Sequence, residues 1–280
     1  MRRTLLLTGG AAAVAAGAYA RLVEPRLLRL PEHELALPHW PARLDGLRVA
    51  LVADLHAGGP HVGLDRLRSL VDRVRAAAPD LVALCGDYVD PTLPGGRRLE
   101  PAAVAAELGR LDAPAGAVAV LGNHDWRHEG EAVPAALREA GIPVLENAAT
   151  RLDVRGGPLW VAGLADVRER DPRAGLALRD VPQDEPVLVL SHDPDAFPYV
   201  PARAALTLSG HLHGGQVDLP LLAGWIVPSR HGSRYKAGHV VEHGRHLFVS
   251  RGVGEAGRAV RLRSPPEVPL LTLRRAGGSR

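Results

Sequence analysis

Cysteine is almost absent from the 280-residue sequence, which contains only Cys85. A lone cysteine forms no intramolecular disulfide, and it excludes metal sites that need several thiolates, such as a four-cysteine zinc site or an iron–sulfur cluster. Any bound metal must therefore be held by histidine, aspartate, glutamate or asparagine. Histidine is plentiful, with 13 residues.

Aromatic residues are also scarce, at 4% of the sequence, whereas a base-stacking surface for nucleic acid needs several of them. The formal net charge of +3 gives no independent support for nucleic-acid binding, because residues 1–30 contain five arginines and one glutamate and leave the rest nearly neutral. No nucleic-acid partner is expected. A hydrophobic fraction of 46% with 23% charged residues suffices for a sizeable core and excludes a long disordered or collagen-like chain.

The N-terminus has the pattern of an export signal. A pair of arginines at positions 2 and 3 precedes an uncharged run that ends in a small-x-small triplet at Ala20. The arginine pair also resembles a twin-arginine signal. The 17 uncharged residues would span about 25 Å as a helix, slightly less than the ~30 Å core of a membrane. We expect residues 1–30 to lie outside the fold, as a cleaved signal peptide or a retained anchor. The protein would be exported, or anchored on the outer face of the cytoplasmic membrane with the membrane surface as a partner.

Short apolar runs alternate with amphipathic stretches through the rest of the chain. Buried strands are predicted for the eight runs of 4 to 7 residues at 47–53, 81–85, 118–121, 160–164, 187–190, 205–208, 246–249 and 270–273. Apolar residues at helical spacing predict helices over 64–74, 102–111 and 133–140. The alternation predicts an α/β fold, with parallel βαβ units in the first half and more antiparallel pairing in the second.

The domain boundaries follow from the same pattern. Residues 31–44 contain three prolines and are predicted to form an extended lead-in or an edge strand rather than a helix. One domain is expected over residues 45–275, followed by a short tail over 276–280.

Side chains of ligand type follow five of the predicted strands, and ligands of α/β sheets bind at the carboxyl ends of the strands. Residues i and i+2 of an extended segment point the same way, so Asp54 and His56, or His211 and His213, would each present two ligands toward one point. Any one of these residues alone is more simply a hydrogen-bonded polar side chain; the fivefold repetition favours a metal site. Mixed carboxylate, imidazole and amide ligands suit Mn, Fe, Zn or a similar ion. The candidate residues are Asp54, His56, Asp87, Asp90, Asn123, His124, His192, His211 and His213.

In their order, these blocks resemble the calcineurin-like metallophosphoesterase family. Its motifs are Asp-x-His, Gly-Asp-x-x-Asp, Gly-Asn-His-Asp/Glu, an isolated His and Gly-His-x-His, which stand here at 54–56, 86–90, 122–125, 192 and 210–213. The C-terminal part is similar to a bacterial exported or membrane-anchored, phosphodiesterase-like branch. The resemblance implies two β-sheets flanked by helices, a four-layer αββα sandwich, with two divalent metal ions at the strand ends.

The resemblance also implies a role for each residue. His124 would be the general acid, and Asp90 would orient it. The implied activity is hydrolysis of a small phosphodiester or phosphomonoester by in-line attack of a metal-bridging hydroxide. The metal ligands would be Asp54, His56 and His213 for one ion, Asn123, His192 and His211 for the other, and Asp87 between them.

One departure from the family narrows the substrate. Pro91 follows Asp90, where many phosphoprotein phosphatases of the family have an arginine that clamps phosphate. This disfavours a protein substrate and favours small phosphodiesters, nucleotides or phospho-head groups. Arg127 and His128 are candidate phosphate contacts or solvated loop residues. Two alternatives remain open, a lipid-linked or head-group phosphoesterase at the membrane face and a non-catalytic metal-binding scaffold.

Overall fold

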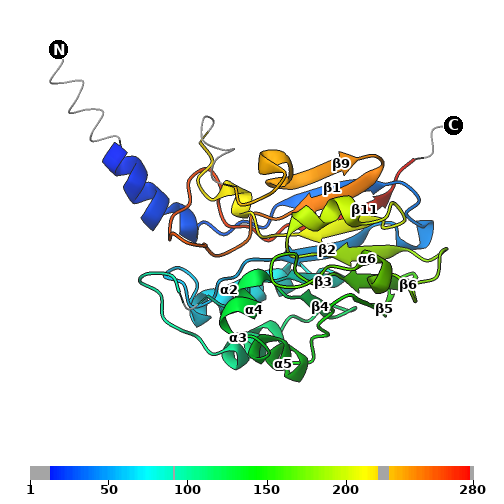
Figure 1. The fold of residues 1–280 in the computed structure, drawn as a ribbon, viewed down its shortest axis with the longest axis horizontal. Coiled ribbons are helices and arrows are strands. Elements are labelled where there is room, and N and C mark those ends of the chain that lie inside the picture. The colour runs from blue at the N-terminus through cyan, green and yellow to red at the C-terminus, as the bar shows by residue number, and fades with distance from the viewer. Residues whose placement is uncertain (1–12, 91, 220–226, 278–280) are drawn as a thin grey trace, which may run out of the picture.

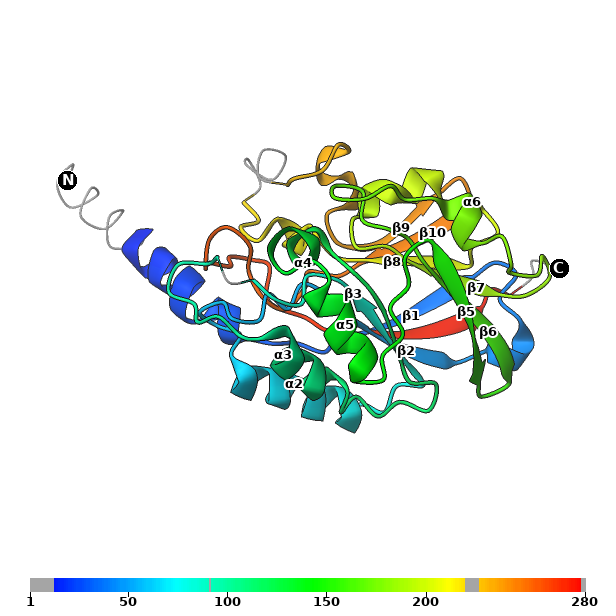
Figure 2. The ribbon, with the colours of Figure 1, turned by 60° about the horizontal axis from the view of Figure 1, so that its bottom comes forward.

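The computed structural model describes residues 13–90, 92–219 and 227–277. In these residues two β-sheets pack face to face, with helices α2 (Leu64–Ala76), α3 (Pro101–Leu108), α4 (Asn123–His128) and α5 (Ala132–Glu139) outside one sheet and α6 (Ala174–Ala177) outside the other (Figures 1 and 2). In spatial order, the first sheet comprises β1 (Glu32–Leu37), β11 (Leu270–Arg275), β2 (Leu47–Val52), β3 (Leu81–Cys85) and β4 (Ala117–Val120). The second comprises β5 (Ala148–Val154), β6 (Gly157–Gly163), β7 (Val187–Leu190), β8 (Leu206–Ser209), β10 (Arg245–Val249) and β9 (Gly238–Glu242). The expected four-layer sandwich is confirmed.

Parallel βαβ units build the first sheet, as the sequence predicts. β2, β3 and β4 pair in parallel, and the connections contain α2 (Leu64–Ala76) and α3 (Pro101–Leu108). The predicted apolar face of α2 is buried through Leu67, Leu70, Val71 and Val74. The third predicted helix is α5 (Ala132–Glu139), and α4 (Asn123–His128) was not anticipated.

The second half does contain more antiparallel pairing than the first, as predicted, but the centre of the second sheet is parallel. β6, β7, β8 and β10 pair in parallel, and only the edge strands β5 and β9 are antiparallel to their neighbours. Parallel neighbours require a crossover connection. Two of these crossovers contain α6 (Ala174–Ala177) and the 3₁₀ helix η3 (Pro194–Tyr199), which are too short to leave a periodic signal in the sequence.

The N-terminal boundary of the fold lies earlier than the sequence indicates. Residues 32–37 form β1, an edge strand parallel to β11, so the edge-strand alternative for 31–44 is confirmed and the sheet begins before residue 45. Residues 20–30 are not outside the fold, because Ala20, Glu24 and Leu28 are buried and the Arg29 N–H donates to the Pro266 carbonyl at 2.9 Å. These contacts join segments more than 200 residues apart, which a local pattern does not reveal.

The helix over residues 13–22 extends away from the body (Figure 1). Within the described ranges, no helix has both the length and the apolarity needed to cross a membrane. The arginine pair and most of the uncharged run lie in residues 1–12, outside the described residues.

An apolar core fills the space between the sheets. It includes Leu51 of β2, Cys85 of β3, Leu188 of β7 and Phe248 of β10, all at most 1% exposed. Cys85 is thus a core thiol. With the core packed along the strands, the polar residues that follow them gather at one rim of the sandwich.

Candidate metal centre

All nine candidate residues come together at the carboxyl ends of β2, β3 and β4 in one sheet and of β7 and β8 in the other. Eight of them are buried, and His124 is partly exposed with 18% of its side chain accessible. The site is therefore shared by the two sheets.

The backbone at the site is strained. Asp54 and His56 have positive φ angles of 52° and 42°, a left-handed conformation that costs a non-glycine residue on the order of 1–3 kcal/mol. Asp87, His211 and His213 are also left-handed, so five of the eleven such non-glycine residues in the described chain belong to the candidate set. The side chains thus converge through tight turns, and the expectation of an extended i, i+2 arrangement is wrong although the convergence is right.

One cluster joins Asp54, His56 and His213, whose ligand atoms lie within 4.8 Å of one another. The Nε2 atoms of His56 and His213 face each other at 3.2 Å, and Asp54 Oδ1 lies 3.6 Å from His213 Nε2. Two nitrogen ligands of one ion, each bonded at about 2.0–2.1 Å, lie about 3 Å apart. The two imidazoles have the spacing of ligands that share an ion.

A second cluster joins Asp87, His192 and His211 within the same limit. His211 Nδ1 lies 3.1 Å from His192 Nε2. Asn123 is at the first residue of α4, and its Oδ1 is buried without a hydrogen-bond partner among the described residues. Because an unsatisfied buried oxygen costs about 1–3 kcal/mol, this acceptor fits a cation ligand.

Asp87 lies between the two clusters. Its Oδ2 is 3.5 Å from His56 Nε2 and 3.2 Å from His192 Nε2. Burial would raise the pKa of this carboxyl, but His192 and His56 hold it well below its usual range. One ionised carboxylate therefore faces both clusters, as expected of a bridging ligand.

The remaining charges also fit cation binding. Burial raises the pKa of Asp54 to about 6, against the effect of His192. Burial opposes charge on His192, yet Asp87 raises its pKa well above the usual value. Burial and His56 lower the pKa of His213, which favours the neutral imidazole that binds metals. A divalent cation would displace the proton of His192 and balance the carboxylates.

Backbone carbonyls orient two of the imidazoles. His192 Nδ1 lies 2.7 Å from the Cys85 carbonyl, and His213 Nδ1 lies 3.2 Å from the Gly254 carbonyl. When Nδ1–H donates to a carbonyl, Nε2 keeps its lone pair for a metal. Both rings therefore present Nε2 to the site.

Asp90 links the predicted acid to a predicted ligand. Its Oδ2 lies 3.1 Å from His124 Nδ1 and 3.2 Å from His56 Nδ1, which agrees with the orienting role implied for it and extends that role to His56. Asp90 Oδ1 accepts from the Thr92 N–H at 2.8 Å. Burial would raise the pKa of Asp90, but His124 and His56 hold it well below the usual range. Pro91 lies outside the described residues.

Asp125 belongs to the third motif block, and the structure gives it a role that its sequence position did not indicate. Its Oδ2 accepts the N–H groups of Asp87 at 2.8 Å and Gly122 at 2.9 Å, and its Oδ1 accepts that of Tyr88 at 2.8 Å. Burial and Asp87 raise the pKa of Asp125 to about 7, while the Gly122 and Tyr88 N–H groups lower it. The side chain ties the loop after β3 to the start of α4.

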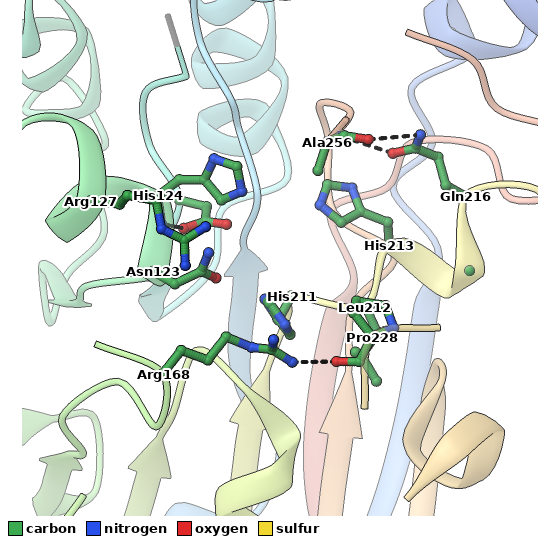
Figure 3. Close-up of a pocket in the computed structure, with 12 residues that line it drawn as sticks. Asn123, His124, Arg127, Arg168, His211, Leu212, His213, Gln216, Pro228 and Ala256 are labelled. Atoms are coloured by element: carbon green, nitrogen blue, oxygen red, sulfur yellow. Dashed lines mark hydrogen bonds between the residues drawn. The ribbon is translucent and has the colours of Figure 1, made fainter. Parts of the chain in front are cut away.

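A pocket of about 290 Å³ opens over the clusters (Figure 3). Arg127 lines it and pairs with Glu169, whereas His128 is not among its lining residues and packs against His124 at 5.3 Å between ring centres. Arg168, which was not among the predicted site residues, also lines the pocket and donates to Asp193 Oδ2 through Nε at 2.9 Å. Arg168 lies in the segment that follows β6, and β6 is parallel to β7. Had this pairing been predicted, Arg168 would have been a candidate, because ligands bind at the carboxyl ends of parallel strands.

Comparison with known proteins gives one consistent family. Residues 47–215 match the calcineurin-like phosphoesterase profile. The chain is 30% identical to the metallophosphoesterase YkuE of Bacillus subtilis over 98% of each chain. It is 31% identical to the phosphodiesterase YaeI of Escherichia coli over 97% of this chain and 98% of YaeI. It is 26% identical to the UDP-2,3-diacylglucosamine pyrophosphatase LpxG of Chlamydia trachomatis, over 93% of this chain and 94% of LpxG.

Replacing Asp125 with asparagine should lower the free energy of unfolding by about 1–3 kcal/mol. In the variant, the amide NH₂ group replaces one carboxylate oxygen and faces at least one backbone N–H, which loses the acceptor that it has in the wild type. Urea unfolding measures the change. Asp65→Asn is the control, since this side chain is 98% exposed and its substitution should stay within about 0.5 kcal/mol of wild type. Equal stabilities for the two variants would contradict the tying role of Asp125.

Proposed function

Because the chain belongs to the calcineurin-like phosphoesterase family, we propose that it is a dinuclear metallophosphoesterase acting on a phosphodiester. The observation that supports this most directly is the pair of buried ligand clusters with Asp87 between them. The family uses divalent metals, and the donor set of carboxylate, imidazole and amide without thiolate suits Mn, Fe or Zn. The proposed ligands are Asp54, His56 and His213, then Asn123, His192 and His211, with Asp87 shared.

Two divalent ions bound there would lower the pKa of a bound water toward neutrality and neutralise phosphate oxygens. The protein would supply the proton for the leaving group. His124 lines the pocket, and its Nδ1 lies beside Asp90, so Nε2 is the atom that would donate. The Asp90 carboxylate would fix the orientation of the His124 ring through its contact with Nδ1.

Two arginines at the pocket would hold the substrate phosphate. Asp193 and the Pro228 carbonyl engage Nε and Nη2 of Arg168, which leaves Nη1 for an anion and fixes the plane of the guanidinium. Arg127 also lines the pocket and lies above Arg168 in the left part of the close-up view (Figure 3). Arginine contacts to phosphate oxygens orient the ester for in-line attack.

The relatives support a diester or pyrophosphate substrate. YaeI is a phosphodiesterase by name, and LpxG is a pyrophosphatase of a diacylated nucleotide sugar by name. Both substrate types present a phosphorus with substituents on two of its oxygens. A small phosphodiester is accordingly the first substrate class to test.

The metal-replete protein should hydrolyse bis(p-nitrophenyl) phosphate, and removal of the metals with a chelator should abolish the activity because the attacking water loses its activation. Asp87→Asn should lose both bound ions and the activity, whereas Asp65→Asn should keep both. Metal analysis and release of p-nitrophenol are the measurements. A metal-replete chain that is inert on phosphodiesters and phosphomonoesters would favour the non-catalytic scaffold instead.

His124→Ala should lower turnover by about 10²–10⁴-fold and leave the metal content unchanged. The loss should be larger for a phenyl leaving group than for p-nitrophenyl, since the poorer leaving group depends more on protonation. His128→Ala, which alters the neighbouring ring, is the control and should change turnover little. Loss of metal in His124→Ala would make His124 a ligand, because its ring lies within 4.8 Å of ligand atoms of His56 and Asp87.

A second candidate function is hydrolysis of a lipid-linked phosphoester by an exported protein on the outer face of the membrane. The N-terminal region exposes large apolar side chains beside Arg21 and Arg26. Apolar side chains next to arginines suit the interface of an anionic membrane, and LpxG, by name, acts on a diacylated substrate. The exposed side chains are Val14, Tyr19, Leu22, Val23 and Leu27.

The full-length chain should sediment with vesicles that contain anionic phospholipid. A Leu22→Ser/Leu27→Ser variant should bind them at least ~10-fold more weakly, because it loses apolar area that would be buried in the interface. Val241→Ser is the control, since Val241 is 54% exposed but lies on β9. Equal binding by both variants, or no binding by wild type, would exclude this mode of membrane attachment.

A further inference from the structure

Residues 20–29, here called the N-terminal strap, contact the loop that supports the first ligand cluster. We propose that the strap is a positioning element for His213, so that binding of one of the two ions depends on it. The inference rests on the proposed metal centre, and it assigns a role to residues outside every phosphoesterase motif.

Two hydrogen bonds in series connect Glu24 of the strap to the backbone of His213. Glu24 is 4% exposed, and its Oε1 accepts the Ser264 N–H at 2.7 Å. The Ser264 hydroxyl in turn donates to the His213 carbonyl at 2.7 Å. Ser264 is itself buried, so these bonds form away from solvent, where losing one partner leaves an unsatisfied polar group.

A second connection runs from Ala20 to the imidazole of His213. The Ala20 carbonyl accepts the Arg261 N–H at 2.8 Å. The buried guanidinium of Arg261 donates to the Gly254 carbonyl through Nε at 3.2 Å, and Gly254 is the residue whose carbonyl faces His213 Nδ1. Arg261 Nη2 also lies 3.3 Å from that Nδ1. The strap therefore contacts the residues that set the orientation of this ring.

The backbone around His213 needs such support. His213 is left-handed with φ of 50°, and Gly214 follows with φ of 61°. A Cβ atom at Gly214 would lie 2.5 Å from the Ser264 hydroxyl oxygen, so Ser264 packs directly against this turn. A strained turn keeps its conformation only when surrounding contacts hold it.

The support is directed to one cluster. The Val253 N–H donates to the Asp54 carbonyl at 3.2 Å, so the segment that contains Gly254 and Ser264 also borders the loop of Asp54. Strap hydrogen bonds reach residues 259–268 and Arg73 of α2. In the part of the chain that the structure describes, none reaches Asn123, His192 or His211. Loss of the hydrogen bonds from the strap to Arg261 or Ser264 should therefore weaken binding of the ion at the first cluster selectively.

The test is metal titration of the full-length apoprotein by calorimetry. Glu24→Ala should weaken one of two Mn²⁺ affinities by about 10-fold, the low end of the effect of removing outer contacts of metal ligands, and should leave the other affinity unchanged. Glu24→Gln keeps an oxygen acceptor for the Ser264 N–H and should restore the weakened affinity.

Leu28→Ala separates positioning from general stability. Leu28 is buried in the same strap but packs in the cluster of α2 and α3, so this variant should lose stability in urea and keep both affinities. If Glu24→Ala does not fold, Ser264→Ala removes only the hydroxyl contact to His213 and should weaken the same affinity. The inference would be overturned if Glu24→Ala left both Mn²⁺ affinities unchanged. It would also be overturned if Glu24→Ala and Leu28→Ala each weakened the two affinities to the same extent. A wild-type chain that binds no metal would instead refute the proposed function.

Discussion

The structure depends on one buried carboxylate, that of Asp87, placed where the rims of two sheets meet. Its Oδ2 lies within 3.5 Å of the imidazoles of His56 and His192, which follow strands of different sheets. The carboxyl ends of these strands must therefore lie close together. There is no room for a side chain beside it: a Cβ atom at Gly122 would lie 2.2 Å from Asp87 Oδ1. Asp125 holds the backbone of both Asp87 and Gly122. Burying so many ionisable groups is costly unless opposite charge is supplied, and the divalent metals that the family uses would supply that charge.

Much of this arrangement was predictable, because the strands of the interior are apolar and the residues that follow them are not. The predicted bounds of β3 and β7 agree with the structure, and all nine candidate residues meet. The parallel centre of the second sheet was missed because α6 and η3 contribute 4 and 6 residues, too few for periodicity. The role of Asp125 was missed because it acts through contacts with residues distant in the sequence, and that of Arg168 because β6 was not recognised as parallel to β7. Glu24 illustrates the general limit, since its partner Ser264 is 240 positions away.

The two ligand clusters differ in what surrounds them. The cluster of His192 and His211 lies at the ends of adjacent parallel strands, β7 and β8, and the carbonyl of Cys85, the last residue of β3, orients His192. The cluster of His213 instead borders the segment between β10 and β11, which contains no strand or α-helix, and that segment contacts the strap. Rigid strands therefore support one side of the centre, and a set of long-range hydrogen bonds supports the other. The pocket and its arginines open across both.

The contact between the strap and the His213 loop has a thermodynamic corollary. Coupling between two equilibria is reciprocal, so if docking of residues 20–29 strengthens cation binding, cation binding must strengthen docking of those residues by the same factor. The stability of strap docking would then depend on whether the centre holds metal. Protection of the strap backbone against hydrogen exchange would report whether the centre is loaded, which makes the N-terminal region a readout of the active site as well as its support.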